Sequence, residues 1–600
     1  MKHQFKPSRR RFMAQTGLGL LGAAVSPIWV KAMEMAAVTA GASAANRANP
    51  NFRPDVEIDL IAQAESLSIL PGQPTRVLQY VAKQVSGPQG VLTPLPGSYL
   101  GPIIRLQKGQ KVRINFHNRL AESSIVHWHG LHVPAEMDGH PMYAIQQGQT
   151  RVYEFEVLNR AGLNIYHPHP HGATATQVYH GLAGGLIVND DEEARLDLPS
   201  GEFEVPIVIQ DKRFDKQNQL IYGSTMHDRM VGYYGDQILV NGRPNVLLEV
   251  ASRAYRLRVI NASTARIYKL GWSDGTPMTI IGVDGGLLPV PETLPYVMLA
   301  PGERLDVWAD FSGRRKGTEL SLRSLPFKGV LPKMAEQMMH GGSGQGMGGG
   351  MGHGMTGGAG MTGAMALPVG ADYPLFRIRV TREVGDSPRL PGRLSSIRSY
   401  SVDDAANAGK PIPIGLSESP MAMLINGRPY APDDIQANER IPVNSVQLIE
   451  IFHAHGGEGG SSHGGDSAGR PTAGMGGMGH GMMGGMGHGM MGGMGQGKAS
   501  GSGMMPMGGM GMMFSMAHPI HLHGQHFQII SRSIGMGEAE NYATVKDGLI
   551  ESGWKDTVLV MPGEKVRIIK PFQDFKGLFM YHCHNLEHED MGMMREFLVE

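Results

Sequence analysis

Short runs of alternating apolar and polar residues, separated by Gly, Pro, Asn and Asp, fill most of the chain beyond residue 50. Clear examples are Lys111–Phe116, Arg151–Val157, Tyr255–Ile260, Leu305–Phe311 and Thr557–Ile569. A two-residue period predicts strands with one buried face, and short strands between turn signals are typical of β-sandwiches. No long amphipathic helix pattern competes with them, so we predict an all-β protein.

Two repeated patterns indicate duplicated domains. A turn glycine, charged residues and an alternating strand recur at Leu106–Ile114, Leu299–Val307 and Val560–Ile568, and Asn-Gly-Arg-Pro recurs at 241–244 and 426–429. Repeats that lie so far apart favour consecutive domains over a solenoid. We place the domains at residues 50–195, 200–330 and 369–600.

Two segments of low complexity interrupt the strand pattern. One spans residues 331–368, between the second and third domains, and the other, 456–513, is inserted in the third. Together they hold more than half of the 41 methionines, mixed with glycine and several histidines. Glycine-rich runs cannot offset their ordering entropy by burial, so we expect both segments to be flexible. A flexible linker is one interpretation; because thioethers suit Cu(I), we favour capture of a soft metal.

The N-terminus carries an export signal pattern. Ser8-Arg9-Arg10-Arg11-Phe12-Met13 precedes a mostly apolar stretch, Leu18–Val30, which is too short to span a membrane. A twin-arginine pair before such a stretch predicts a Tat signal peptide over residues 1–45, and hence a periplasmic protein without a stable membrane anchor. Cleavage near Ala44 or near Ala32 fits the small residues there.

Composition narrows the chemistry. Lys plus Arg and Asp plus Glu are both 54, which argues against a basic nucleic-acid binder. A single cysteine excludes an internal disulfide and any cysteine-built zinc or iron–sulfur site made by this chain alone. Twenty-five histidines beside that cysteine point to soft and borderline metals.

The histidines form pairs whose spacing suits a strand, because side chains at i and i+2 share a face. Four His-x-His pairs recur along the chain: His127 with His129, His167 with His169, His521 with His523, and His582 with His584. Four such pairs cannot plausibly be incidental. Eight neutral imidazoles can hold several copper ions and leave room for oxygen.

The last pair flanks the only cysteine. His582 and His584 must point away from Cys583, so one tripeptide can serve metals on both of its faces. On the cysteine face, His518, Cys583, His588 and a more distant methionine form a trigonal His₂Cys set with a weak axial thioether. That set is typical of blue-copper electron-transfer sites.

These motifs resemble those of the multicopper oxidases over nearly the whole chain after residue 50. The resemblance is carried by His127-Trp-His-Gly, His167-Pro-His, His518-Pro-Ile-His-Leu-His-Gly and His582-Cys-His-Asn-Leu-Glu-His-Glu-Asp-Met-Gly-Met. It implies three cupredoxin-like Greek-key sandwiches and four copper ions per chain. Within the family, the chain is similar to the Tat-exported bacterial copper-tolerance oxidases with methionine-rich segments.

The resemblance also implies a role for each ligand. The type 1 ligands would be His518, Cys583, His588 and Met593, where the family spacing selects Met593 over Met591 and Met594. The type 2 copper would take His127 and His521. The type 3 pair would take His129, His167, His169, His523, His582 and His584.

Further residues match functional positions less completely. Asp138 and Glu589 match acidic positions that the family uses to supply protons. Phe514 stands where related cuprous oxidases commonly have an aspartate that binds substrate Cu(I), although Met516 is kept; Met512 and Met513 could supply thioethers instead. His132, His140, His171 and His526 fit no ligand position, and we interpret them as hydrogen-bonded histidines beside the site.

The expected function is oxidation of Cu(I), and of phenols less selectively, with O₂ as acceptor, by a monomer that binds no nucleic acid. A general laccase with incidental methionine segments is one alternative, and a periplasmic copper-sequestering protein is another. A copper-free scaffold with this fold is a third, against which the twelve ligand positions argue.

Overall fold

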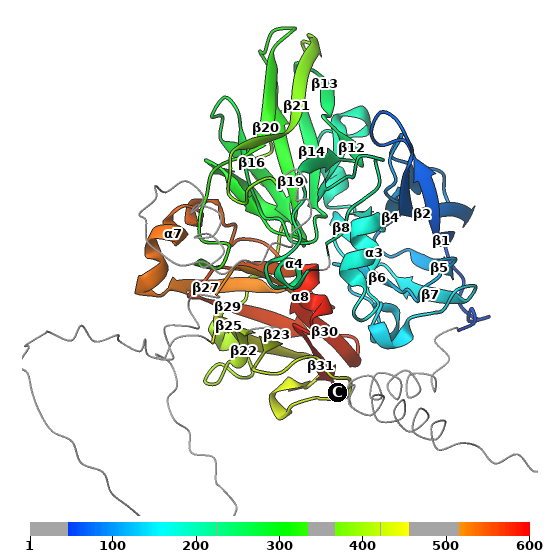
Figure 1. Ribbon diagram of the computed structural model, residues 1–600, viewed down its shortest axis with the longest axis vertical. Helices are drawn as coiled ribbons and strands as arrows, with labels where there is room; N and C mark the ends of the chain where they lie inside the picture. Colours follow the sequence, from blue (N-terminus) through cyan, green and yellow to red (C-terminus); the bar gives the residue numbers. More distant parts are fainter. Residues whose placement is uncertain (1–45, 224, 334–365, 420–421, 455–514) are drawn as a thin grey trace, which may run out of the picture.

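The computed structural model describes residues 46–223, 225–333, 366–419, 422–454 and 515–600. In these residues the strands form six sheets, paired into three sandwiches that follow one another along the chain (Figure 1). The prediction of an all-β protein is confirmed. The export signal and most of the two methionine-rich segments lie outside the described residues, and the described part contains no helix long and apolar enough to cross a bilayer.

The first sandwich packs a four-stranded sheet on a five-stranded one. The first sheet has the order β2-β1-β5-β7, with β1 Val56–Leu67, β2 Thr75–Ser86, β5 Lys111–Asn118 and β7 Thr150–Glu156. The second has the order β3-β4-β9-β8-β6, with β3 Leu92–Thr93, β4 Ile103–Gln107, β6 Val126–His129, β8 Gly162–Pro168 and β9 Gly184–Asn189. In β5, buried and more exposed residues alternate, as the sequence pattern predicts.

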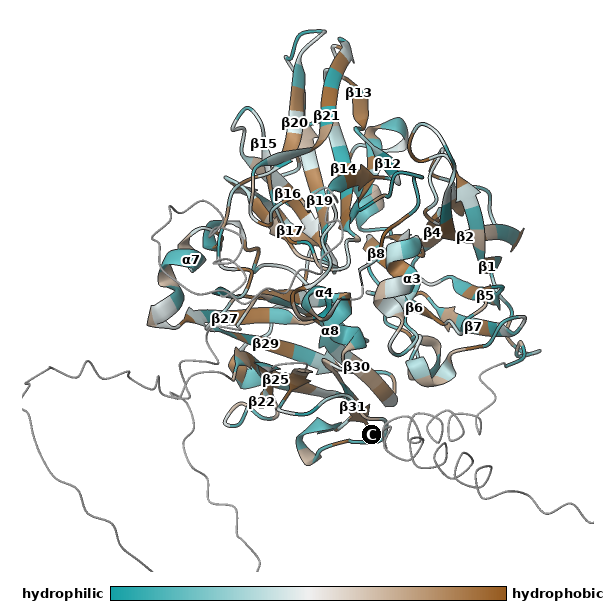
Figure 2. Cartoon of the chain, viewed as in Figure 1, coloured by the Kyte–Doolittle hydropathy of each residue, from teal (hydrophilic) through white to brown (hydrophobic). Residues whose placement is uncertain are grey.

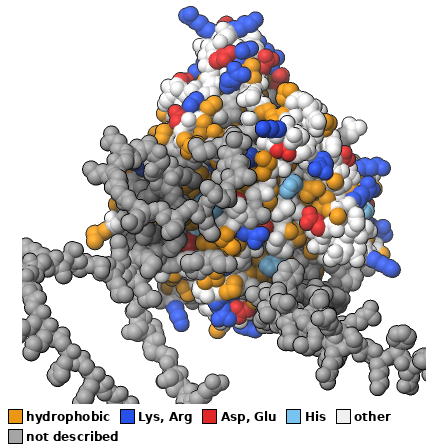
Figure 3. Space-filling view, in the orientation of Figure 1, with side chains coloured by type: hydrophobic (Ala, Val, Ile, Leu, Met, Phe, Trp, Pro, Cys, Tyr) orange, Lys and Arg blue, Asp and Glu red, His pale blue; other side chains and the backbone are white. Residues whose placement is uncertain are grey.

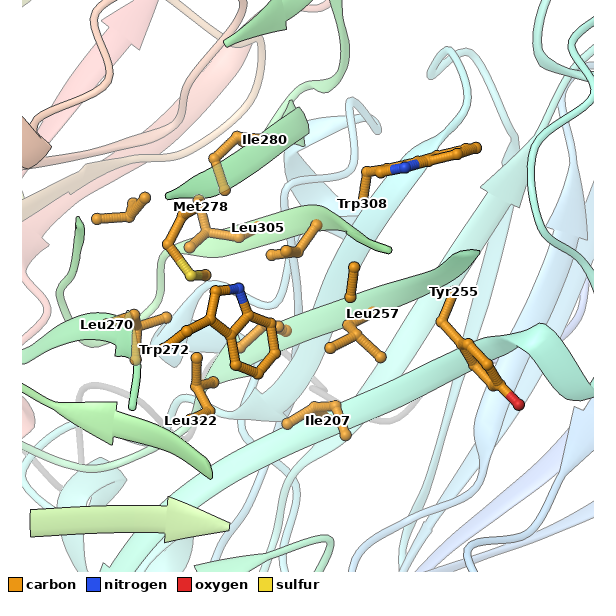
Figure 4. Close-up of a cluster of buried hydrophobic side chains, with 14 of the residues drawn as sticks. Ile207, Tyr255, Leu257, Leu270, Trp272, Met278, Ile280, Leu305, Trp308 and Leu322 are labelled. Atoms are coloured by element: carbon orange, nitrogen blue, oxygen red, sulfur yellow. The ribbon is translucent and has the colours of Figure 1, made fainter. Parts of the chain in front are cut away.

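The second sandwich has sheets of seven and five strands. The seven-stranded order is β12-β11-β10-β14-β19-β16-β17, with β10 Glu204–Lys212, β11 Gln237–Val240, β12 Arg243–Pro244, β14 Ala254–Asn261, β16 Met278–Val283, β17 Gly286–Leu294 and β19 Arg304–Asp310. The five-stranded order is β13-β21-β20-β15-β18, with β13 Leu247–Ala251, β15 Tyr268–Trp272, β18 Val297–Leu299, β20 Glu319–Ser324 and β21 Tyr373–Arg382. Trp272, Met278 and Trp308 belong to its apolar core (Figure 4).

Strand β21 corrects the expected domain boundary. It pairs with β20 and with β13, so it completes the second sandwich, although the sequence pattern placed residues from 369 onward in the third domain. The first methionine-rich segment therefore interrupts the second sandwich and does not link two finished domains. Pairing partners that lie so far apart in sequence leave no local signal, so the strand pattern alone does not reveal this boundary.

The third sandwich has two five-stranded sheets. The first has the order β23-β22-β25-β29-β27, with β22 Ile412–Ser419, β23 Ala422–Ile425, β25 Ser445–His453, β27 Gln528–Ile534 and β29 Glu564–Phe572. The second has the order β24-β31-β30-β26-β28, with β24 Arg440–Ile441, β26 His518–Leu522, β28 Thr557–Val560, β30 Gly577–Cys583 and β31 Met594–Val599. In Figure 2, β27 and β29 of the first sheet run as teal and brown bands, whereas strands β26, β28, β30 and β31 of the second sheet are buried along nearly their whole length.

Short helices lie where the sandwiches meet. Helices α3 (Thr174–His180), α4 (Met226–Val231) and α8 (Leu586–Asp590) come from the first, second and third sandwich, and α8 contacts both of the others. Helix α7 (Ala539–Ala543) lies to one side (Figure 1). On the described face in Figure 3, basic and acidic side chains are interspersed, in keeping with equal numbers of each in the chain.

Candidate metal centres

Strands β26 and β30 are neighbours and place the third sandwich's ligand candidates on two faces. Their antiparallel register sets Ile520 opposite Cys583 and His521 opposite His582. Because side chains alternate, His518 and Cys583 point into the apolar core, while His521 and His582 point outward to the first sandwich. In the first sandwich, β6 and β8 set His127 opposite His167.

On the core face, three donor atoms form a compact triangle. Cys583 Sγ lies 3.4 Å from His518 Nδ1 and 3.7 Å from His588 Nδ1, and the two imidazole nitrogens are 3.3 Å apart. Met593 is fully buried in the same apolar cluster, and its carbonyl oxygen accepts a hydrogen bond from Cys583 N at 3.0 Å. We call these four residues the cysteine cluster.

The outer nitrogens of this cluster are held by hydrogen bonds. His518 Nε2 donates to Glu418 Oε1 at 2.8 Å, and His588 Nε2 donates to the carbonyl oxygen of Met230 at 3.2 Å. Each imidazole therefore keeps its Nδ1 unprotonated and turned toward Cys583, as in a metal-binding histidine. Burial raises the pKa of the Cys583 thiol and lowers that of His588, so the sulfur needs a bound cation to be a thiolate.

On the other face, eight histidines from two sandwiches converge. His127 Nε2 and His521 Nε2 are 3.3 Å apart, while their Nδ1 atoms donate to the carbonyl oxygens of Asp138, at 2.6 Å, and Asp556, at 2.9 Å. We call the eight residues the histidine cage: His127, His129, His167, His169, His521, His523, His582 and His584.

A second group in the cage is a triad of Nε2 atoms. His582 Nε2 lies 3.2 Å from both His169 Nε2 and His523 Nε2. Outside the triad, His523 Nδ1 donates to Asp138 Oδ2 at 2.8 Å, and His582 Nδ1 lies 3.1 Å from Glu589 Oε2. The two acidic residues singled out in the sequence therefore both contact cage histidines.

The third group is His129, His167 and His584. Their ring centroids are 4.9–5.6 Å apart. His129 Nδ1, His167 Nε2 and both nitrogens of His584 are buried without a hydrogen-bond partner among the described residues. Buried polar atoms without partners are costly, and a metal ion is the partner that three unprotonated imidazoles fit.

Burial keeps six of the eight cage histidines neutral. It lowers the pKa of His521 to about 3, and it lowers the pKa of His129, His167, His169, His523 and His584 well below the ordinary value. Neighbouring imidazoles add to the effect, since a second positive charge nearby is unfavourable. Neutral imidazole is the form that binds copper.

The sequence interpretation missed three residues around the cage. Asp556 Oδ1 lies 3.0 Å from His129 Nε2, and both Asp556 oxygens accept from Arg304 Nη1 and Nη2 at 2.7 and 2.6 Å. Arg304 comes from the second sandwich, as does Gly302. At Gly302 φ is 82°, and a Cβ would lie 2.8 Å from the His584 ring. The sequence pattern predicts a turn at Pro301–Arg304, but nothing local links this turn to the site.

The four histidines interpreted as non-ligands have other partners. His132 Nε2 lies 2.9 Å from Asp574 Oδ2, His140 Nε2 lies 2.9 Å from Glu596 Oε1, and the His171 ring is 5.1 Å from that of Tyr430. His526 Nε2 lies 3.5 Å from Asp556 Oδ2. Met512, Met513 and Phe514 lie outside the described residues, whereas Met516 is buried in the core that holds Cys583.

A buried triangle of one sulfur and two imidazoles, backed by a cage of eight more, is the donor arrangement of a copper protein with several metal ions. Two multicopper oxidase family models match the chain, at residues 80–193 and 505–600, which carry all the predicted ligands. The chain belongs to the laccase-like multicopper oxidases, copper-dependent oxidoreductases that use oxygen.

Relatives and solved structures agree with this placement. A laccase of Bacillus subtilis is 26% identical over 549 residues, covering 83% of this chain and 88% of the laccase. The crystal structure of the multicopper oxidase McoA from Aquifex aeolicus has a TM-score of 0.66 and 28% identity, covering 92% of this chain and 97% of McoA. The cell division protein FtsP of Xenorhabdus nematophila is 39% identical, but over only 36% of this chain and 46% of FtsP.

Proposed function

We propose that the protein is a periplasmic, Tat-exported multicopper oxidase that couples one-electron oxidation of Cu(I), and of phenols less selectively, to reduction of O₂ to water. Four copper ions per chain would be held as type 1 by the cysteine cluster, as type 2 by His127 and His521, and as the type 3 pair by the remaining six cage histidines. When bound, copper supplies one-electron transfer and the activation of oxygen.

The protein's own residues prepare these sites. Outward hydrogen bonds leave one nitrogen of most of the histidines unprotonated and aimed at a shared point. Cys583 lies between His582 and His584, so a single tripeptide joins the cysteine cluster to the cage. Asp138 and Glu589 contact cage histidines, where a carboxyl group can hold a proton for oxygen reduction.

Oxidation of Cu(I) is supported by the residues around His518. Glu418 is buried and accepts hydrogen bonds from His518 Nε2 at 2.8 Å and from Met516 N at 3.0 Å. His453 Nδ1 lies 3.7 Å from the same Glu418 oxygen. A carboxylate, an imidazole and a methionine beside a type 1 histidine suit a copper ion that gives up an electron there. Glu418 would thus supply, from another strand, the carboxylate that Phe514 lacks.

The test is oxygen consumption by Glu418→Gln with Cu(I) and with a dimethoxyphenol. Gln keeps an acceptor for His518 and removes the charge, so we expect the KM for Cu(I) to rise about tenfold and phenol oxidation to change less. Glu450→Gln on β25 is the matched control, because Glu450 pairs with Arg567 at the surface. Equal losses on both substrates would contradict a Cu(I) site at Glu418.

The methionine-rich segments suggest capture of Cu(I) close to that site. The second segment rejoins the described chain at Ser515, three residues before His518, and tethering raises the local concentration of a captured ion. Deleting Gly456–Met512 should raise the KM for Cu(I) and preserve phenol oxidation, and deleting Met334–Ala366 should have a similar, separable effect. Loss of activity toward both substrates would make the segments folding elements.

Two alternatives predict different outcomes. A general laccase, which the 26% identity to the Bacillus subtilis enzyme supports, would oxidise phenols with no preference for Cu(I). A copper-sequestering protein would bind Cu(I) without steady-state consumption of oxygen. An oxygen electrode with each reductant separates the three.

A further inference from the structure

A small cleft borders the histidine cage at His523. Its lining includes His132 of the first sandwich and His523, Gln525, Lys570, Gln573 and Phe575 of the third. His523 is a cage residue, and none of the lining residues belongs to the cysteine cluster. The cleft has room for about one water molecule, and apolar side chains such as Phe572 and Phe579 line it beside the polar ones.

Lys570 is a buried amine in this cleft. It lies in β29, and its side chain is 1% exposed. Its Nζ donates to the carbonyl oxygen of Gln525, and within the described residues it forms no ion pair with a carboxylate. Burying an unpaired ammonium is costly, and this lowers the pKa of Lys570 to about 7. Lys570 can therefore both gain and lose a proton near neutral pH.

The carboxylates that act electrostatically on Lys570 also orient the cage. Asp138 and Asp556 are the acidic groups whose charges act on it. Asp138 Oδ2 accepts from His523 Nδ1 at 2.8 Å, whereas its Oδ1 is buried without a hydrogen-bond partner among the described residues. Asp556 is neutralised by Arg304. Asp556 thus has an arginine partner, whereas Asp138 Oδ1 lies 3.5 Å from His127 Nδ1.

The outer neighbours connect the cleft to solvent. His132 Nε2 lies 2.9 Å from Asp574 Oδ2, and the Asp574 side chain is 53% exposed. The charge of Lys570 acts on His132, whose pKa burial lowers to about 4. The remaining titratable group nearby is His526, whose Nε2 lies 3.5 Å from Asp556 Oδ2. An exposed carboxylate therefore contacts the almost fully buried imidazole of His132, which lines the cleft together with Lys570.

We propose that Lys570 is a proton carrier that supplies the histidine cage through this cleft. The proposal rests on the oxidase function, because reduction of one O₂ to two waters consumes four protons. The Lys570 ammonium releases a proton to the inner end of the cleft, toward Asp138. The resulting amine regains one from cleft water near His132 and Asp574. Lysine returns to its starting state, and no electron moves in this step.

Three variants of the copper-loaded protein separate proton transfer from electrostatics. Lys570→Met removes the charge and the proton site and keeps the length, Lys570→Gln removes both and keeps polarity, and Lys570→Arg keeps the charge but cannot release a proton. Lys565→Met is the control, because Lys565 lies on the same strand but pairs with Glu450 at the surface. The reaction to follow is reoxidation of the fully reduced protein by O₂, in H₂O and in D₂O.

We expect reoxidation at pH 7 to slow at least tenfold in all three variants and to show a larger solvent isotope effect. The copper content, the blue absorption band and the anaerobic rate of type 1 reduction should stay unchanged. Recovery of the rate in Lys570→Arg would overturn the proposal in favour of a charge effect. Failure of all three variants to fold and bind copper would overturn it in favour of a structural role. If the unmodified protein consumes no oxygen with any reductant, the oxidase function itself fails.

A readout independent of turnover tests the amine directly. Because the pKa of Lys570 is lowered in the folded state, its amine binds fewer protons there than in the unfolded state between about pH 7 and pH 10. The free energy of unfolding of the unmodified protein, relative to that of Lys570→Met, must therefore rise with pH across that window. A pH-independent difference between the two would contradict an amine that titrates near 7.

Discussion

The cysteine cluster and the histidine cage lie on opposite faces of one strand, yet they are built differently. All four residues of the cysteine cluster come from the third sandwich, within an apolar core. The cage takes half of its histidines from the first sandwich and half from the third, and Arg304 of the second sandwich holds Asp556 beside it. The cluster therefore takes all four of its residues from one domain and only the Met230 carbonyl that orients His588 from the second, whereas the cage depends on the docking of three.

Replacing Cys583 by Ser tests the cysteine cluster and should have the largest effect of the four changes. The soft sulfur ligand is lost, and with it the electron path that runs from the sulfur through residue 583 to His582 and His584, so the blue band and oxidase activity should both fall to background. Copper bound in the cage should remain, as read by metal analysis and electron paramagnetic resonance. Retention of colour and activity would refute the type 1 assignment.

Replacing Arg304 by Met tests whether the histidine cage depends on domain docking while the cysteine cluster does not. Buried Asp556 would lose its bidentate partner, a change that costs about 3–5 kcal/mol, and His129 and His521 would lose a fixed neighbour. We expect cage copper and oxygen reduction to be lost while the blue band persists. Arg314→Met, which removes an ion pair near the surface, is the control. A parallel loss of the blue band would show that the cluster also depends on domain docking.

Removing copper should expose the cage to acid. The folded pKa of His521 is about 3, below the unfolded value, so the folded state binds fewer protons between about pH 3 and pH 6.5. Stability is therefore lost as pH falls through that window, by up to about 1.4 kcal/mol per unit for each such histidine. Acid titration of unfolding should show a higher midpoint pH for the copper-free than for the loaded protein. Coincident curves would indicate that copper does not bind these nitrogens.

Replacing Met593 by Leu should have the smallest effect and tests which methionine is the axial ligand of the cysteine cluster. A weak donor to the oxidised metal is lost, so the type 1 potential should rise while copper stays bound. Redox titration of the blue band measures this, with Met591→Leu as the comparison. A lowered or unchanged potential would favour Met591 or Met594 as the axial group.

Local periodicity explains what the sequence could predict. The His-x-His spacing places two side chains on one face of a strand, and the four pairs do meet in one cage. Glu418, Asp556 and Arg304 carry no such signal, since each contacts the site from another strand or another sandwich. The membership of strand β21 in the second sandwich is not predictable from local pattern for the same reason, because its partners β13 and β20 precede a long insertion.

The late position of β21 also bears on the order in which the chain is completed during synthesis. Until residues Tyr373–Arg382 have left the ribosome, β13 and β20 each lack a neighbour in their sheet. At a translation rate of about 5–20 residues per second, the insertion delays that closure by several seconds. During this interval β13 and β20 of the second sandwich expose unpaired backbone groups that a chaperone binding exposed strands could cover.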